Sequence, residues 1–305
     1  MYQIANRMKL IDPKTTPTKD LHQYLVGAVA PRPIAFASTV DEEGNPNLAP
    51  YSFFNCFSSN PPILVFSSNR RVSNNSTKDT LYNIEQTGEV VINVVNYSIL
   101  RQMALTSVDY PKGVSEFQKS GLTPIPSDLV KPFRVKESPA QMECKVQQII
   151  PLGEEGGAGH LIICEIVRMH LHESVLDENG KINPHKMDLM GRMGRAFYVR
   201  ASGESIHKVF QPFNVLGIGY DQLPENARNS KVLTGNNLGM LASLPEVPEQ
   251  SATMAIKTEK EVAKALSSDH PLRSLHLLAQ KELAKEEKER AAKLVWLGAY
   301  LELKG

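Results

Sequence analysis

The chain has few cysteines and no long apolar run, and both absences limit the kind of protein it encodes. Its three cysteines, Cys56, Cys144 and Cys164, form no C-x-x-C pair. Such an odd set encodes neither a disulfide framework nor a thiolate zinc site, so we expect a reducing compartment. No apolar run reaches the roughly 18 residues of a transmembrane helix, and the first residues lack a signal-peptide core. We therefore predict a cytoplasmic protein without a membrane partner.

An excess of charge of either sign is also lacking. Lys and Arg together number 34, Asp and Glu number 33, and the formal net charge is +1. A chain so close to neutral has no general attraction for a nucleic-acid backbone, so we expect no nucleic-acid partner. The apolar share of 41% and the charged share of 22% are typical of globular proteins and exclude a disordered, collagen-like or coiled-coil chain.

The residue patterns of common active sites are missing as well. We find no P-loop lysine signature, no G-x-S-x-G elbow and no paired-carboxylate or Cys/His arrangement. His170 and His172 are spaced for two metal ligands, with His160 or His185 as a third, but no carboxylate pattern completes the set, so we predict no metal site. This lack suits a protein in which a bound cofactor supplies the reactivity.

Strand-like segments dominate the first two hundred residues. Ile34 to Val40 and Asn47 to Phe57 flank a turn-forming Asp-Glu-Glu-Gly segment, which predicts a hairpin. Pro50 removes a hydrogen-bond donor, so the second strand should lie at a sheet edge or be bulged. Further strands are predicted at Ile63 to Ser67 and Val90 to Val95.

A helix is predicted between these last two strands, capped by Asp79, Ser76 or Thr77 and ending at Gly88. Gln141 to Ile150 and Gly159 to His172 predict a long hairpin with a Gly- and Glu-rich loop. Many antiparallel strands with little helix between them indicate a closed or nearly closed barrel rather than a parallel α/β sheet.

The composition changes at about Ser205, which predicts two domains, residues 1–205 and 206–305. Phe213 to Leu244 is rich in glycine and predicts loops, whereas Ile256 to Gly305 has a helical pattern broken at Pro271. Four leucines form a narrow apolar stripe that we expect to pack on something else, because such a stripe cannot make a core unaided. The stripe consists of Leu272, Leu275, Leu278 and Leu283.

Three polar motifs are candidates for ligand binding. Pro31 and Pro33 fix the backbone around Arg32 before a strand, which holds a planar cation against a flat or anionic ligand. Asn47 to Asn55 combines hydroxyl, amide and aromatic groups with a backbone that Pro50 leaves open to a heteroaromatic ring. The alternatives are a turn with a surface arginine and a hairpin strand with core aromatics.

The third motif combines Ser67 to Arg71 with Lys78 to Thr80 at the predicted helix start. Hydroxyls, cations and a helix N-terminus together favour an anion such as phosphate. A solvated basic loop is the alternative.

In this order, the motifs resemble the flavin reductase-like family of FMN-binding split barrels, which includes flavoredoxin-like proteins. Gly27 to Phe36, Asn47 to Asn55 and Lys78 to Thr80 are similar to its landmarks in the first half. Tyr110 to Gly113 and Met190 to Arg192 are similar to those of the second half. The resemblance extends from about residue 21 to residue 200.

The resemblance implies a mainly β fold, a six-stranded antiparallel split barrel with Greek-key connections, flanking helices and a C-terminal loop and helical extension. It implies one FMN per subunit of a homodimer, and hydride transfer from NADH or NADPH to flavin or electron transfer through bound FMN, without a protein catalytic residue. The implied FMN-binding residues are Pro31, Arg32, Pro33, Ile34, Ser38, Thr39, Ala49, Pro50, Tyr51, Ser52, Phe53, Ser67, Asn69, Arg70, Arg71, Lys78, Asp79 and Thr80.

Two features depart from the resemblance. Met193-Gly194-Arg195 stands where a Leu-Gly-Gly-like segment is expected, and the C-terminal extension belongs to only some relatives. We expect that extension to cover the flavin or the dimer. The alternative functions are a non-catalytic FMN carrier that acts with a redox partner protein, and a barrel that binds a heteroaromatic ligand without redox chemistry.

Overall fold

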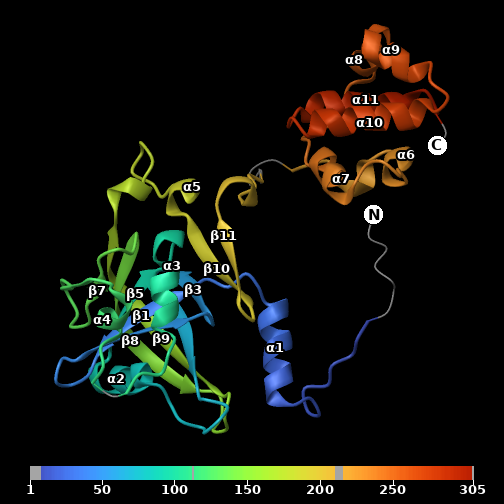
Figure 1. The fold of residues 1–305 in the computed structure, drawn as a ribbon. Helices are drawn as coiled ribbons and strands as arrows, with labels where there is room; N and C mark the ends of the chain where they lie inside the picture. Colours follow the sequence, from blue (N-terminus) through green and yellow to red (C-terminus); the bar gives the residue numbers. More distant parts are fainter. Residues whose placement is uncertain (1–7, 112, 210–215, 304–305) are drawn as a thin grey trace. The chain divides into compact units, whose positions relative to one another are not determined.

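The computed structural model describes residues 8–111, 113–209 and 216–303, and the chain divides into two units, residues 1–207 and 208–305 (Figure 1). Lys112 of the Tyr110 to Gly113 motif and Phe213 of the predicted loop region lie outside the described residues.

A seven-stranded antiparallel sheet forms the first unit, in the order β2-β1-β5-β8-β9-β4-β3. The strands are β1 (Ala35–Val40), β2 (Pro46–Tyr51), β3 (Phe54–Ser59), β4 (Pro62–Asn69), β5 (Glu89–Val94), β8 (Ala140–Pro151) and β9 (Gly159–Leu171). The prediction of a mainly antiparallel barrel-like fold is confirmed, but the expected six strands are seven. The extra strand arises because the segment predicted as one strand, Asn47 to Phe57, is broken into β2 and β3.

The break after Tyr51 shapes the sheet. β2 and β3 lie at opposite edges, yet only Ser52 and Phe53 join them. Three Cα steps of about 3.8 Å span roughly 11 Å, so the sheet must curl until its edges approach each other. The amide of Ser67 in β4 donates to the carbonyl of Phe53 at 2.8 Å, which extends the β3–β4 ladder into this connection. Pro50 lies in an edge strand, as predicted.

Short elements flank the sheet. They are α1 (Thr18–Ala28), α2 (Asp79–Thr87), α3 (Leu100–Leu105), α4 (Glu116–Ser120), α5 (Pro184–Met187) and two small ladders, β6 (Pro124–Ile125) with β7 (Arg134–Val135) and β10 (Leu189–Gly194) with β11 (Phe197–Ala201). The helix predicted to end at Gly88 is α2, and Gly88 adopts φ +67° as its C-cap. The predicted N-caps are wrong, because Lys78 occupies that position without a side-chain cap.

The core of this unit lies on both faces of the sheet. All six residues of β1 are buried. Ala35 and Ala37 pack inside the curled sheet with Phe66 and Ile162, whereas Phe36 faces the flanking elements and packs with a second cluster. Successive side chains of a strand point to opposite faces, so β1 is covered from both sides.

The second unit is helical and has its own core. Its helices are α6 (Glu225–Arg228), α7 (Gly235–Ala242), α8 (Gln250–Ala255), α9 (Lys260–Leu266), α10 (Pro271–Leu283) and α11 (Lys288–Tyr300). The loop prediction for residues 213–244 is wrong where α6 and α7 form; the side chain of Thr234 caps α7 in a reciprocal pair with Asn237. Among the described residues, no helix is long and apolar enough to span a membrane.

The leucine stripe of α10 is covered within this unit. Leu272 and Leu275 are buried, and Leu275 packs in one cluster with Val295 and Trp296 of α11. The stripe therefore packs on neighbouring helices of the same unit. That the extension covers the flavin or the dimer stays a prediction.

Candidate functional site

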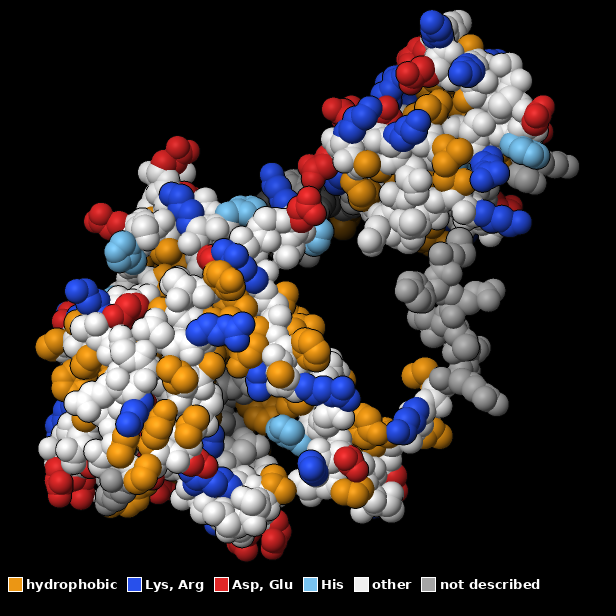
Figure 2. Space-filling view, in the orientation of Figure 1, with side chains coloured by type: hydrophobic (Ala, Val, Ile, Leu, Met, Phe, Trp, Pro, Cys, Tyr) orange, Lys and Arg blue, Asp and Glu red, His pale blue; other side chains and the backbone are white. Residues whose placement is uncertain are grey.

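Three adjoining cavities follow the segment where β2 passes into β3. The central cavity, of about 450 Å³, lies between α1, residues 50–53 and the end of β4. A small polar cavity of about 80 Å³ shares Pro50, Tyr51, Arg71 and Lys78 with it. On the other side a cationic cavity of about 380 Å³ shares His22, Ser52 and Phe53 with it. Figure 2 shows the hollowed surface beside α1, with Lys and Arg side chains around it.

Apolar side chains line much of the central cavity. Leu21 and Leu25 of α1 face it together with Phe53 and Val72. The ring of His22 stands edge-on to that of Phe53, with the ring centroids 6.1 Å apart at an interplanar angle of 88°. These walls suit a flat, largely apolar ligand.

A lysine that forms no ion pair with any described residue closes one end of this cavity. The half-buried ammonium of Lys78 lies 5.0 Å from the ring centroid of Tyr51. Among the residues that the structure describes, no carboxylate pairs with it and no hydrogen bond is made to it. Burial lowers the pKa of Lys78, because the charged form is poorly solvated there. An anion bound at this point would offset that loss of solvation.

Tyr51 supplies a neutral wall beside Lys78. Its side chain is buried, and its ring packs on Phe66 with centroids 5.3 Å apart. Burial raises the pKa of Tyr51 to about 12. The phenol therefore stays protonated at neutral pH and contributes no negative charge to the cavity.

Arg71, by contrast, is already engaged. Its Nη2 lies 2.7 Å from Oδ1 of Asp109 and its Nε lies 3.1 Å from Oδ2, while Nη1 donates to the Ser76 hydroxyl at 3.1 Å and to the Thr77 carbonyl at 2.5 Å. The hydrogen bond from Arg71 is the main cause that lowers the pKa of Asp109. Arg71 therefore borders the cavity while it fixes the loop from residue 71 to residue 77.

Hydrogen bonds between β4 and the loop after β8 build the floor of the central cavity. The hydroxyl of Ser67 donates to the side chain of Asn69 at 2.9 Å, and the amide of Asn69 donates to the Gly157 carbonyl at 3.0 Å. The backbone amide of Arg70 donates to Ala158 at 2.8 Å. These bonds hold polar side chains along one wall.

The structure brings most of the candidate residues to these cavities. Pro50 to Phe53, Ser67, Asn69, Arg70, Arg71 and Lys78 line the central cavity, and Ala49, Asp79 and Thr80 line the small polar one. The hydroxyl of Thr80 accepts a hydrogen bond from the Asn47 amide at 2.8 Å. Arg32 lines the cationic cavity.

The remaining candidates lie elsewhere. Pro31 and Pro33 line none of the three cavities, and Ile34 is part of the core. Ser38 and Thr39 are fully buried in β1. Thr39 uses its hydroxyl to accept hydrogen bonds from the amides of Asn47 at 3.3 Å and Asn83 at 3.0 Å. The Thr39 hydroxyl therefore links β1 to α2 through Asn83, whereas the Ser38 hydroxyl has no hydrogen-bond partner among the described residues.

Sequence reasoning missed the contributions of α1 and Asp109. His22, Leu21 and Leu25 reach the cavity because α1 packs beside residues 50–53. Asp109 meets Arg71 across 38 residues of sequence. No short motif in the sequence encodes either contact.

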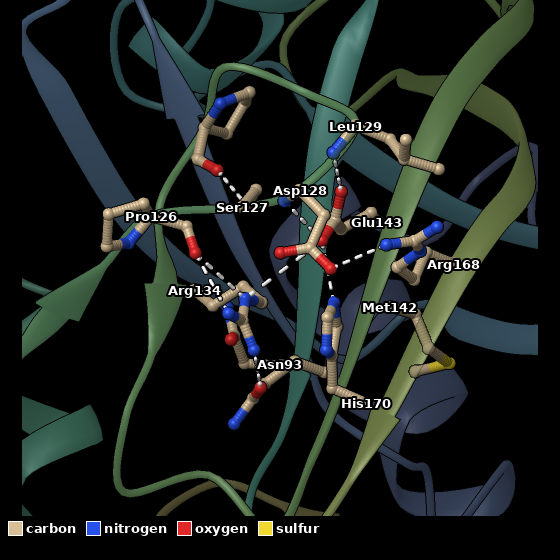
Figure 3. A network of polar contacts seen from close by, with 12 residues as sticks. Asn93, Pro126, Ser127, Asp128, Leu129, Arg134, Met142, Glu143, Arg168 and His170 are labelled. Carbon is tan, nitrogen blue, oxygen red and sulfur yellow. Dashed lines mark hydrogen bonds and ion pairs between the residues drawn. The ribbon is translucent and has the colours of Figure 1, made fainter.

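A separate network surrounds the buried carboxylate of Glu143 (Figure 3). Glu143 accepts hydrogen bonds from the amides of Asp128 at 2.9 Å and Leu129 at 2.6 Å, and His170 Nε2 lies 2.7 Å from it. Burial alone would raise the pKa of Glu143, but these hydrogen bonds hold it below its ordinary value.

The same network contains a set of groups close enough to hold a metal ion. Ligand atoms of Asp128, Glu143 and His170 lie within 4.8 Å of one another. Arg168 forms an ion pair with Asp128 at 2.6 Å, so this carboxylate already has a positively charged partner. We therefore interpret the network as a structural link between residues 126–134 and the sheet. His172 contacts Ser174 at 2.7 Å and His160 contacts the Ser68 carbonyl at 3.2 Å, so the histidine set is dispersed.

Comparison with known proteins identifies relatives of the first unit. The model of the flavin reductase like domain matches residues 27–188, and the helical unit lies outside that match. A protein of Aquifex aeolicus is 38% identical over 196 residues, which cover 64% of this chain and 97% of the relative.

Solved structures agree with this match. Component B of nitrilotriacetate monooxygenase from Bacillus cereus is 32% identical, with a TM-score of 0.62 over 68% of this chain and 100% of that one. The 2-nitrobenzoate 2-nitroreductase of Pseudomonas fluorescens is 28% identical, with a TM-score of 0.60 over 67% of this chain and 98% of that one. A Shewanella frigidimarina protein with a split barrel domain is 27% identical, with a TM-score of 0.56 over 65% and 95%.

Proposed function

The chain belongs to the flavin reductase-like domain family, and from this premise we propose that its first unit binds FMN in the central cavity and acts as a flavin-dependent oxidoreductase. When bound, the flavin would accept a hydride from a reduced nicotinamide, NADH or NADPH, and supply the redox chemistry. The chain's own residues bind the cofactor, orient it and keep one side covered.

One observation carries the proposal: the half-buried ammonium of Lys78, which forms no ion pair among the described residues, lies at the end of an apolar cavity. FMN has the same two parts, a flat heteroaromatic ring and a phosphate on a polar chain. Leu21, Leu25 and Phe53 offer contact surface to the ring. Lys78 and the N-terminus of α2 offer positive potential to the phosphate, and both border the small polar cavity.

The donor set supports the same orientation. Ser52 and Ser67 contribute hydroxyls and Asn69 an amide along the central cavity. Such neutral groups suit the ribityl chain and the polar edge of the ring. Asp109 already engages the guanidinium of Arg71 with two hydrogen bonds. Arg71 therefore contributes positive potential and a rigid loop, and few free donors for the phosphate.

A binding titration tests the proposal. We expect the full chain to bind FMN more tightly than riboflavin, and Lys78→Met to weaken FMN roughly tenfold or more, since a hydrogen bond to a charged group contributes about 1.5–3 kcal/mol. Riboflavin affinity should hardly change. Lys136→Met, which removes an exposed lysine that lines none of the three cavities, is the control. Equal affinity of the wild type for the two flavins would contradict the assignment.

We further propose that the first unit forms a homodimer. β3 is an edge strand, and its Phe57 is 67% exposed; Phe197 in β11 is exposed to the same extent. Unpaired edges with large apolar side chains are ordinarily covered in stable proteins. Sedimentation at micromolar concentration checks this, and a monomer that retains FMN would contradict it.

A second candidate function is electron transfer through bound FMN to a partner protein. The observation in its favour is the helical unit, which has its own core and lies outside the family match, as expected of a docking module. The rate of FMN reduction by free NADH or NADPH separates the two, because a carrier that depends on a partner would be reduced slowly by either.

A further inference from the structure

The cationic cavity next to the central one contains positive charge that the proposed FMN site does not use. Four cationic side chains and a single carboxylate line it, from α1, the segment before β1 and the β10–β11 hairpin. They are Lys19, Arg32, Arg192 and Arg195 with Asp20. A cavity walled by charges of one sign concentrates ions of the opposite sign.

Arg32 is the most buried of these cations, at 6% exposure. Its Nη1 donates to the carbonyls of Val26, at 2.5 Å, and Val29, and so caps the C-terminal end of α1. Its Nε has no hydrogen-bond partner among the described residues. Burial, and then the nearby charge of Arg192, lower the pKa of this guanidinium. The cavity therefore contains a buried cation whose charge meets only neutral acceptors.

The other cations are also without a carboxylate partner in the described part of the chain. The guanidinium of Arg192 lies 4.6 Å from the ring centroid of Tyr198. With the Gln23 amide turned so that its oxygen faces the hairpin, Arg195 donates to that oxygen at 3.1 and 3.2 Å. Within residues 8–111, 113–209 and 216–303, no ion pair involves Lys19, Arg192 or Arg195.

The backbone presents Arg195 in an unusual way. Arg195 has φ +47°, in the left-handed region that side chains other than glycine rarely adopt. The preceding Gly194 is pressed against α1, where an added Cβ would lie 3.0 Å from the Val26 carbonyl. Arg195 belongs to the tight turn of the β10–β11 hairpin, where a left-handed backbone is common, and it lines the cavity.

We propose that the cationic cavity binds an oxyanion, a phosphate or a carboxylate, of the second substrate that exchanges electrons with the flavin. The inference rests on the proposed function. Ser52, Phe53 and His22 line both this cavity and the central one, so a molecule anchored here by its anionic group reaches the flavin cavity directly. Arg192 and Arg195 provide the anchoring donors, and Arg32 adds to the local potential from a fixed position.

Calorimetric titration of the FMN-loaded full chain tests this with two probes, oxidised NADP+ for phosphate and benzoate for carboxylate. Arg195→Gly removes the charge and suits the left-handed backbone, so it should not destabilise the fold. We expect this variant to bind at least one probe about fivefold more weakly or worse, and the loss of affinity to be smaller at high salt. Arg195→Lys should retain most of the affinity. Arg101→Gln, an exposed arginine of α3 that lines none of the three cavities, is the control.

The two probes identify the source of the anion. If Arg195→Gly loses affinity for NADP+ alone, the cavity is assigned to the phosphates of a nicotinamide dinucleotide. If it loses affinity for benzoate alone, the cavity is assigned to a carboxylate substrate. If FMN affinity is intact and Arg195→Gly binds both probes as Arg101→Gln does, the inference is wrong and the proposed function stands. If the chain does not bind FMN, the proposed function fails, while a loss of probe binding by the flavin-free Arg195→Gly would still support the anion site.

Discussion

Arg71 and Asp109 form a two-bonded ion pair at the rim of the small polar cavity, with Nη2 2.7 Å from Oδ1 and Nε 3.1 Å from Oδ2. The pair joins the loop after β4 to the segment after α3. Because the carboxylate occupies one side of the guanidinium fork, the geometry favours a positioning role for Arg71.

This role predicts the behaviour of a double-mutant cycle. We expect Arg71→Ala and Asp109→Ala each to weaken FMN binding about two- to threefold, because a partly exposed pair contributes at most about 1 kcal/mol. The double variant should be no weaker than either single one, since both changes release the same loop. FMN titrations of the four proteins measure this. A tighter complex in Asp109→Ala would indicate that Arg71 binds phosphate directly once it is freed.

The separate core of the helical unit predicts that this unit unfolds independently of FMN binding. Leu275 is fully buried there, and Leu275→Ala should cost about 2–5 kcal/mol. Trp296, the single tryptophan of the chain, lies in the same core, so its fluorescence reports on this unit alone. We expect the fluorescence transition in urea to shift while FMN affinity stays unchanged. A parallel loss of FMN binding would show that the two units depend on each other.

His276 makes the stability of the helical unit depend on pH. Burial lowers its pKa to about 4. Ser230 accepts hydrogen bonds from Val232 and Leu233, each at 3.1 Å, so its own hydrogen is donated to His276 Nδ1, 2.8 Å away. The folded unit thus holds a neutral imidazole, whereas the unfolded chain takes up a proton below about pH 6.5.

Stability should accordingly be unaffected by this residue above about pH 6.5 and fall progressively down to about pH 4. Integrated over that window the loss is about 3 kcal/mol. Urea unfolding followed by Trp296 fluorescence at about pH 7 and pH 5 measures it. His276→Gln should be less stable at neutral pH but lose most of this pH dependence. An unchanged slope in that variant would assign the effect to other groups.

Glu143 should stabilise the first unit through its charge. Its carboxylate is fully buried and accepts from two amides and His170, so Glu143→Gln should cost about 2 kcal/mol or more by leaving donors unmatched. Because its pKa is lowered in the folded state, this stabilisation is present above the ordinary carboxyl pKa and is lost as the pH falls through the folded value. Denaturant unfolding of the two proteins at neutral and acidic pH checks both expectations. Equal acid sensitivity in Glu143→Gln would contradict the assignment.

Sequence reasoning was reliable where local pattern decides the structure. The strand predicted at Val90 to Val95 is β5, and the predicted long hairpin is β8 and β9. Gly88 ends α2 as expected. It was less reliable where distant contacts decide. The break after Tyr51 has no strong local signal, because Ser52 and Phe53 leave strand geometry only to connect two sheet edges.

The site shows the same division. Arg70, Arg71 and Lys78 are equivalent candidates in the sequence. Only the fold pairs Arg71 with Asp109 and leaves Lys78 without an ion-pair partner among the described residues. The sequence makes Ser38 and Thr39 candidate site residues. In the structure both are fully buried, and Thr39 accepts a hydrogen bond from Asn83. In the helical unit, the Thr234 and Asn237 cap was present in the sequence and outweighed the local glycines.

Anaerobic addition of NADPH or NADH to the FMN-loaded chain tests the central claim most directly. We expect one FMN per chain, and loss of the oxidised-flavin absorbance faster than with free FMN at the same concentration, because under the proposed function the chain would hold the flavin ring and the nicotinamide next to each other. A chain that does not retain FMN, or that retains it and shows no faster reduction by either nucleotide, would contradict the account.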